Sequence, residues 1–195
     1  MNIGVIILAG GSSTRMTGYK QLLDYKGKSF IKRLCDQLSA LSVKNIICVT
    51  GHLHEELKSE LKETIVHCIH NPDHEKGMVT TLKVGIREVM NISKSSDAVL
   101  VCLTDQPLIP LEHYKALIQN ANTSDSSIIT SGYDDTVGPP VIFKSAHYQS
   151  LLDLPKGKSA KSLIKQHLDT AIVLQCAEAS KDIDTDQDYK SLIDG

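Results

Sequence analysis

Short runs of apolar, mostly β-branched residues recur along the chain and predict a series of buried strands. Six such runs lie at residues 3–8, 45–50, 64–69, 98–104, 126–131 and 170–175. Within each run the apolar residues are nearly continuous and do not alternate with polar ones. Because this pattern leaves no polar face, both faces of each strand are expected to be covered, as in a parallel sheet.

The segments between these runs have the spacing of amphipathic helices. In residues 30–41, Phe30, Leu34 and Leu38 recur at intervals of four and share one helical face. Comparable segments occupy residues 54–62, 78–90, 111–121 and 186–193. Strands that alternate with helices are typical of an α/β protein, a three-layer α/β/α sandwich with a mostly parallel sheet. The polar clusters between elements are too short to be domain linkers, so a single domain over residues 1–195 is predicted.

Composition and charge exclude several classes of protein. With 41% hydrophobic residues and no tryptophan, the chain can bury a sizeable aliphatic core. A net charge of −2 argues against a broad nucleic-acid surface. No apolar run approaches the ~20 residues of a membrane span, and the first residues lack the basic region of a signal peptide. The five scattered cysteines favour buried, reduced thiols. A cytoplasmic protein that binds neither nucleic acid nor a membrane is therefore expected.

The first predicted strand runs into a loop with the composition of a phosphate-binding site, within the segment ILAGGSSTRMTGYKQLL. Glycines let backbone N–H groups approach an anion, and Ser12, Ser13 and Thr14 add hydroxyl donors. Arg15 offers a fork for phosphate oxygens and Lys20 a point charge. The alternative is an ordinary Gly-Ser turn with solvated cations. The glycine spacing matches neither a Walker A loop nor the G-x-G-x-x-G fingerprint.

A carboxylate follows the predicted strand at residues 98–104. Asp105 stands directly after this strand, in the segment TDQPLI. Open α/β sheets bind ligands at the carboxyl ends of their strands, so Asp105 is expected at the same sheet edge as the first loop. A carboxylate there is well placed to hold Mg²⁺ against phosphate oxygens. As an alternative, Asp105 caps the next helix, and Pro107 suits a helix start.

The segment KDIDTDQDY near the carboxyl terminus carries four aspartates within seven residues. Asp184 follows Ile183 in what could be a very short strand. Thr185 or Asp186 is expected to cap the last helix, and on these residues alone capping at a solvated acidic end is the favoured interpretation.

Two other segments bear on ligand binding. In residues 71–86, Gly77 precedes a predicted helix that has Thr80 and Thr81 in its first turn. The two threonines could present their hydroxyls to a planar base. The alternative is a loop followed by a capped helix without a ligand. In GPPVIF, the two prolines disfavour a central strand and predict an edge strand or a close approach to a ligand. His52 and His54 lack a third ligand at metal spacing, so zinc is not expected.

Six segments occur together and in order: LAGGSSTRMTGYKQLL, NPDHEKGMVTTLKVGI, TDQPLI, GPPVIF, GKSAKSL and DIDTDQDY. This set resembles the MobA-like nucleotidyltransferase family, and specifically its molybdenum cofactor cytidylyltransferase (MocA-like) branch. The resemblance covers nearly the whole chain and implies a Rossmann-like fold of the nucleotide-diphospho-sugar transferase type. It also implies transfer of a nucleoside monophosphate from a nucleoside triphosphate to a phosphorylated acceptor, with Mg²⁺ and release of pyrophosphate. The acceptor would be molybdenum cofactor, a phosphorylated pterin, and a molybdoenzyme or its chaperone would be the protein partner.

The resemblance also assigns roles position by position. It places the nucleotide-binding loop on Leu8, Ala9, Gly10, Gly11 and Ser12, the triphosphate cations on Arg15 and Lys20, and the base-contacting hydroxyl on Thr81. The metal-binding carboxylates would be Asp105 and, by looser similarity, Asp184. Arg15, Lys20 and Asp105 would then carry catalysis.

Three departures from the family pattern bear on the substrates. Leu8-Ala9-Gly10-Gly11 stands where cytidylyl enzymes usually read L-A-A-G and resembles the guanylyl form. The spacing from Arg15 to Lys20 and the T-D-Q-P element look cytidylyl-like, so CTP is favoured and GTP is the alternative. Thr17 stands where glycine is common, and Pro139 where histidine is common. Two further hypotheses stay open, a nucleotidyltransferase with another phosphorylated acceptor and a non-catalytic cofactor-binding or delivery protein.

Overall fold

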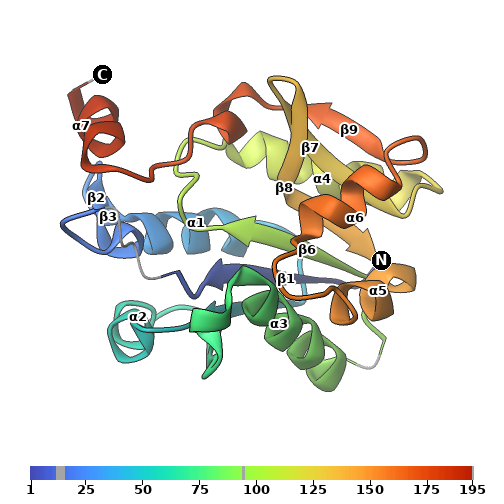
Figure 1. Ribbon diagram of the computed structural model, residues 1–195, viewed down its shortest axis with the longest axis horizontal. Helices are drawn as coiled ribbons and strands as arrows, with labels where there is room; N and C mark the ends of the chain where they lie inside the picture. The colour runs from blue at the N-terminus through green and yellow to red at the C-terminus, as the bar shows by residue number, and fades with distance from the viewer. Residues whose placement is uncertain (12–15, 94, 195) are drawn as a thin grey trace.

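A central seven-stranded sheet with helices on both faces organises the protein (Figure 1). The structure is a computed structural model and describes residues 1–11, 16–93 and 95–194. The strand order is β5-β4-β1-β6-β8-β7-β9. The sheet strands are β1 (Ile3–Ala9), β4 (Asn45–Thr50), β5 (Val66–His70), β6 (Ala98–Leu103), β7 (Ile128–Tyr133), β8 (Thr136–Lys144) and β9 (Ile172–Gln175). A separate small hairpin joins β2 (Asp24–Tyr25) to β3 (Lys28–Ser29).

The helices fill most connections between the strands. They are α1 (Phe30–Ser39), α2 (His54–Glu60), α3 (Met78–Ile92), α4 (Leu111–Thr123), α5 (Tyr148–Leu152), α6 (Ala160–Gln166) and α7 (Asp186–Asp194). Short 3₁₀ helices are η1 (Lys20–Leu22), η2 (His74–Lys76), η3 (Ser145–His147) and η4 (Ala177–Ser180). In the described part of the chain, no helix is both long and apolar enough to cross a bilayer.

The predicted α/β sandwich is confirmed. Each of the six apolar runs overlaps a strand, and five of the helices overlap the predicted helical segments. β5, β4, β1 and β6 run parallel to one another, as do β7 and β9, whereas β8 is antiparallel to both of its neighbours. The short helices α5 and α6 were not predicted.

Strand β8 corrects one of the two alternatives predicted from its prolines, the edge strand, while Pro139 lines a cavity and the close approach to a ligand stays a prediction. β8 lies inside the sheet between β6 and β7. Its pairing with β6 begins only at Val141. On the β7 side the register shifts between Thr130 and Ser131, whose partners are Val141 and Gly138. Pro139 and Pro140 therefore fall in an irregular stretch outside the regular pairing, which is where an interior strand tolerates proline.

Two aliphatic layers cover the sheet, one on each face. Alternate residues of β1 point to opposite layers: Ile7 packs with α1, α2 and α4, and Ile6 packs with α3, α5 and α6. In α1 the predicted face is buried, and Ser29 caps the helix by accepting a hydrogen bond from the Lys32 N–H at 3.2 Å. Burial on both faces fixes the parallel strands, so their carboxyl ends meet at one edge.

Candidate active site

The carboxyl ends of β1 and β6 deliver most of the predicted site residues to one edge of the sheet. β1 and β6 are direct neighbours, with Leu8 in register with Leu103. Gly10 and Gly11 follow β1, and Asp105 lies just beyond the end of β6. Asp105 does not cap the next helix, because α4 begins at Leu111 after an N-cap at Pro110. The side chain of Asp105 is therefore available to the sheet edge.

Three charged residues from distant parts of the sequence converge at this edge. Nζ of Lys20, the first residue of η1, lies 2.5 Å from Oδ2 of Asp105 and 3.0 Å from Oδ1 of Asp184. Asp184 reaches this position because the Ile183 N–H donates to the Asp105 carbonyl at 2.8 Å. The short strand considered for Ile183 and Asp184 does not form, but this one bond still aligns the segment with the end of β6.

The convergence changes the titration of Lys20. Burial of the ammonium by itself lowers the pKa, but the adjacent Asp105 and Asp184 carboxylates outweigh this and hold the pKa of Lys20 above its ordinary value. Lys20 is therefore a cation at neutral pH, and one positive charge is shared by two carboxylates.

The carboxyl-terminal segment is fixed to the same edge by further hydrogen bonds. Nε2 of Gln106 donates to the Ala179 carbonyl at 2.9 Å and to Oδ1 of Asp182 at 3.0 Å. Burial and the nearby Asp105 charge raise the pKa of Asp182 to about 6. The predicted cap of α7 is confirmed, because Thr185 Oγ1 accepts from the Asp188 N–H at 3.2 Å.

The two carboxylates fit a divalent cation. Asp105 and Asp184 already share one cationic partner, and Oδ1 of Asp105 is buried without a hydrogen-bond partner among the described residues. Mg²⁺ in phosphate-handling sites is commonly held by one or two carboxylates together with substrate oxygens. Within the described residues there is no group of three or more acidic, histidine or cysteine side chains able to hold a metal. A metal at Asp105 and Asp184 would therefore need oxygens from a ligand.

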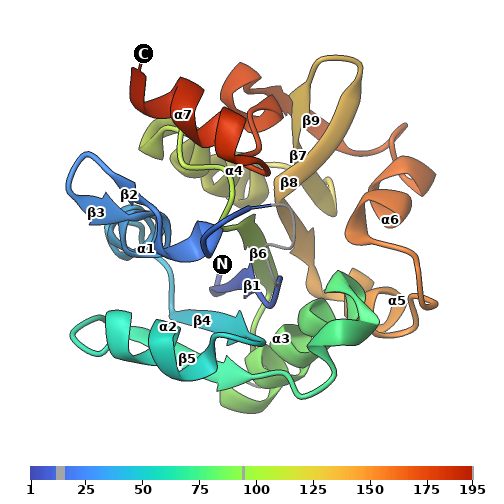
Figure 2. The ribbon, with the colours of Figure 1, turned by 60° about the vertical axis from the view of Figure 1, so that its left-hand side comes forward.

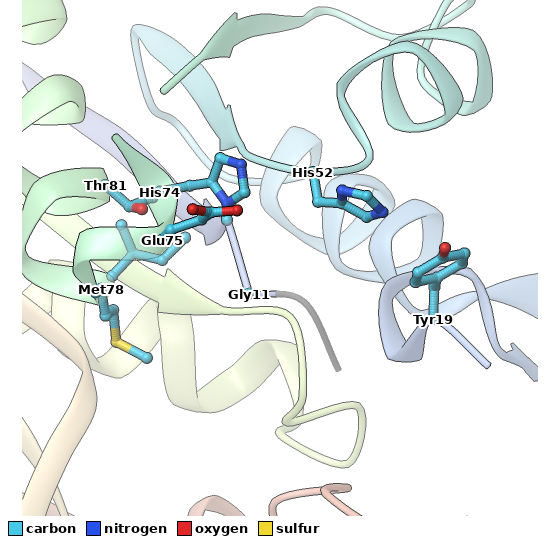
Figure 3. Close-up of a pocket in the computed structure, with 10 residues that line it drawn as sticks. Gly11, Tyr19, His52, His74, Glu75, Met78 and Thr81 are labelled. Carbon is cyan, nitrogen blue, oxygen red and sulfur yellow. The ribbon is translucent and has the colours of Figure 1, made fainter. Parts of the chain in front are cut away.

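A cavity of about 610 Å³ lies beside the end of β1. Its lining includes the predicted nucleotide-binding residues Leu8, Gly10, Gly11 and Thr81. In Figure 3, His74, Glu75, Met78 and Thr81 lie on one side of Gly11, and Tyr19 and His52 lie on the other. Two other described members of the predicted nucleotide site do not line this cavity: Ala9 is buried in the sheet, and Lys20 lies with Asp105 and Asp184. The predictions for Ser12, Ser13, Thr14 and Arg15 lie outside the described residues.

Gly10 and Thr81 touch so closely that only glycine fits at position 10. A Cβ atom added to Gly10 would lie 2.6 Å from Oγ1 of Thr81, inside the closest approach of real side chains. Thr81 is 2% exposed, and its Oγ1 accepts a hydrogen bond from Nδ2 of Asn71 at 3.1 Å. The hydroxyl therefore keeps its own proton to donate into the cavity.

Several site residues were not predicted. The rings of Tyr19 and His52 lie 6.0 Å apart, those of His52 and His74 6.5 Å apart, and all three line the cavity. Gln21, 1% exposed, donates from Nε2 to the Gly11 carbonyl at 2.8 Å and so ties η1 to the end of β1. His52 follows the end of β4, so the rule that ligands bind at strand ends could have indicated it. The other contacts leave no local signal in the sequence.

A second cavity, of about 270 Å³, shares Leu8 and Met78 with the first. Most of its wall is aliphatic, with Leu82, Val101 and Pro139 among its residues. Its polar groups include Tyr133, Ser159, Lys161 and Asp182, and Nζ of Lys161 lies 5.9 Å from the centre of the Tyr133 ring. Two cavities thus meet along one wall at the carboxyl edge of the sheet.

A mostly parallel α/β sheet with a cavity and convergent charges at its carboxyl edge defines a Rossmann-like ligand-binding protein. Comparison with known families is more specific: the chain belongs to the MobA-like NTP transferase domain family, whose model matches residues 5–171. The expected family membership is thereby confirmed, and with it membership of a nucleotidyltransferase family. Asp184 and α7 lie beyond the matched residues.

Curated proteins are similar to this chain in sequence, and solved structures are similar to it in fold. The purine catabolism protein PucB of Bacillus subtilis is 26% identical, over 94% of this chain and 92% of PucB. The bifunctional protein GlmU of Francisella philomiragia is 30% identical over 71% of this chain, but the chain spans only 30% of the length of GlmU. The crystal structure of Rv0371c from Mycobacterium tuberculosis has a TM-score of 0.83 at 23% identity, covering 100% of this chain and 98% of that one, and a manganese complex of Rv0371c has a TM-score of 0.80.

Proposed function

We propose that this protein is a Mg²⁺-dependent nucleotidyltransferase that transfers a nucleoside monophosphate to a phosphorylated pterin cofactor and releases pyrophosphate. CTP is the favoured donor and GTP the alternative. The observation that carries the proposal is the convergence of Lys20, Asp105 and Asp184 beside a cavity large enough for a nucleoside. Two carboxylates, a lysine and a glycine-lined strand end are the groups that a magnesium–triphosphate requires.

The reaction brings two anions together, so neutralisation of charge and alignment of the substrates are its main requirements. A phosphate oxygen of the acceptor attacks the α-phosphorus, and the bond from the α-phosphorus to the bridging oxygen of the β-phosphate breaks. Lys20 stabilises the charge that develops on the α-phosphoryl oxygens. Arg15 and the loop amides hold the β- and γ-phosphates. Asp105 and Asp184 would hold Mg²⁺, which supplies Lewis-acid stabilisation of the phosphoryl charge when bound.

The first cavity is the donor site in this proposal. The backbone of Gly10 and Gly11 lets a ligand approach closely, and the hydroxyl of Thr81 has a proton to donate to a base edge. The rings of Tyr19, His52 and His74 supply flat surfaces next to that position.

The second cavity is the acceptor site. It adjoins the donor cavity through Leu8 and Met78 and includes Asp182 of the carboxyl-terminal segment. Its aliphatic residues can cover the faces of a planar ring, and Tyr133, Ser159, Lys161 and Asp182 can pair with the polar edge of a pterin, whose groups would each cost about 1–3 kcal/mol if left without a partner. A flat ring between aliphatic walls is the feature that makes a pterin the acceptor in this proposal.

A nucleotide panel tests the proposed function. The protein is incubated with Mg²⁺, molybdopterin or molybdenum cofactor, and CTP, GTP, ATP or UTP in turn, and released pyrophosphate is measured. Pyrophosphate is expected with CTP, or with GTP, only when the pterin is present, and glucose 1-phosphate is expected to be a poor substitute. Tight binding of nucleotide or pterin without pyrophosphate would favour the non-catalytic delivery protein. Faster turnover with the sugar phosphate would refute the pterin assignment.

A further inference from the structure

The last helix contacts the segment that leads into η1, far from it in sequence. Asp186, the first residue of α7, accepts a hydrogen bond from the Thr17 N–H, at 3.2 Å to Oδ1, and its Oδ2 accepts one from the Thr17 hydroxyl. These groups are separated by 169 positions in the chain. Thr17 lies three residues before Lys20. The carboxylate of Asp186 therefore fixes the backbone immediately before the lysine of the candidate active site.

A second contact, one turn along α7, holds the other end of the same region. The Tyr189 hydroxyl donates to the Asp24 carbonyl at 2.9 Å, and the Tyr189 ring meets the Phe30 ring edge-on, with centroids 6.2 Å apart. Both views show α7 at the same end of the molecule as the β2–β3 hairpin (Figures 1 and 2). One face of α7 thus spans the chain from Thr17 to Phe30, on either side of Lys20.

The attachment of α7 is mainly polar. No residue of α7 is fully buried. A cavity of about 520 Å³ adjoins the helix, and its lining includes Tyr25, Leu108 and Ile183 together with Asp188 and Leu192 of α7. Few buried apolar contacts make an element easy to detach. The hydrogen bonds of Asp186 and Tyr189 are therefore a large part of what keeps α7 in place.

We propose that Asp186 is a positioning residue for the nucleotide reaction and that α7 acts as a clasp, which holds the Thr17–Lys20 segment in its nucleotide-binding arrangement. This inference rests on the proposed function. Lys20 is anchored at its Nζ by Asp105 and Asp184, and Asp186 anchors the backbone that carries it. α7 lies beyond the residues matched by the family, so membership of the family does not imply this role.

A purely structural role is the alternative to the clasp. An acidic residue in the first turn of a helix stabilises that helix through its dipole, and Asp186 occupies such a position. Loss of that effect would lower the stability of the protein without a specific effect on nucleotide. The two roles therefore predict different results: only the clasp predicts that loss of Asp186 weakens nucleotide binding and that this loss depends on Thr17.

The test measures the dissociation constant of Mg²⁺–CTP and of Mg²⁺–GTP, and the KM and kcat for pyrophosphate release, in wild type and variants. Asp186→Ala is expected to raise the Kd and the KM for the donor about tenfold, since charge-assisted hydrogen bonds are lost. The kcat at saturating donor is expected to stay within about threefold, because the lost interaction serves binding more than the transition state. Gln187→Ala, on the exposed side of the same turn, should leave all three values unchanged.

The partner residue supplies the second arm. Thr17→Val should weaken donor binding in the wild-type background and have no further effect in Asp186→Ala, and Thr17→Ser should restore the wild-type Kd. Additive effects, or an unchanged Kd in Asp186→Ala, would overturn the clasp. If the wild type binds donor but releases no pyrophosphate, the proposed function fails. The Kd values of the variants would still show whether Asp186 supports donor binding as the clasp requires. A chain that binds no nucleotide overturns both.

Discussion

Replacement of Gly10 by alanine is the sharpest structural test of how the first loop and α3 meet. The added Cβ would lie 2.6 Å from Oγ1 and 3.3 Å from Cγ2 of Thr81, so one of the two segments has to move. Overpacking of a well-packed site typically costs about 1–3 kcal/mol. We therefore expect Gly10→Ala to lower the free energy of unfolding by about 2 kcal/mol and to weaken donor binding, because the loop is displaced from the cavity.

Removal of the threonine side chain should relieve the clash. In Thr81→Ala the two atoms nearest to the new methyl group are removed, and the Cβ of residue 81 lies 3.5 Å from it, which is an ordinary contact. Thr81→Ala alone loses the 3.1 Å bond from Asn71, a cost of about 1 kcal/mol, while Asn71 keeps its 2.9 Å bond to Thr80. The double variant should therefore cost about 1 kcal/mol instead of the sum of about 3, a coupling of roughly 2 kcal/mol.

The assay is urea unfolding followed by circular dichroism, since the chain has no tryptophan. The binding of CTP and of GTP is measured on the wild type, the two single variants and the double variant. Gly11→Ala serves as a matched control, because a Cβ on Gly11 meets no atom of the described residues within 4 Å. Single-variant costs that simply add in the double variant, or a Gly10→Ala protein as stable as Gly11→Ala, would refute the close contact between the loop and α3.

Two further predictions concern charge. Lys20→Ala removes the cation shared by Asp105 and Asp184, so it should abolish most turnover and lower the free energy of unfolding by about 1–2 kcal/mol. Because the two carboxylates then lack this cation, Mg²⁺ should raise the melting temperature of the variant more than that of the wild type. An equal Mg²⁺ effect in both proteins would count against a metal at these carboxylates. Burial lowers the pKa of His113, so unfolding takes up a proton and stability should fall as the pH drops through the ordinary histidine pKa of about 6.5. His113→Gln should flatten the dependence of the melting temperature on pH between about 7 and 5.5, and an unchanged dependence would count against a buried, neutral His113.

Much of the fold was predictable because it depends on local patterns. Continuous apolar runs indicate strands covered on both faces, and the spacing of Phe30, Leu34 and Leu38 indicates the buried face of α1. The edge-strand alternative for β8 was wrong because the sequence does not show where a strand pairs. Its prolines are tolerated by the shift in register against β7, which is a property of two strands together.

The candidate site was predictable where a strand end or a family motif identified it. Asp105 and Gly10 follow strands, so the topology of a parallel sheet brings them to one edge. The contact between Thr17 and Asp186 was beyond reach, because it joins segments 169 residues apart and neither residue carries a local signal for the other. Tyr19 and His74 escaped for the same reason, whereas His52 follows the end of β4 and could have been indicated by the strand-end rule. Tertiary contacts between loops decide the details that sequence patterns leave open.

Pyrophosphate release by Asp105→Asn tests the central claim most directly, because asparagine keeps the shape of the side chain and removes the charge that would hold the metal. Oδ1 of Asp105 is buried without a partner among the described residues, so a metal-bound role predicts a large loss. With saturating Mg²⁺, donor and pterin, turnover should fall by about 100-fold or more while circular dichroism and the melting temperature stay near those of wild type. A folded Asp105→Asn protein that releases pyrophosphate at close to the wild-type rate would contradict the account.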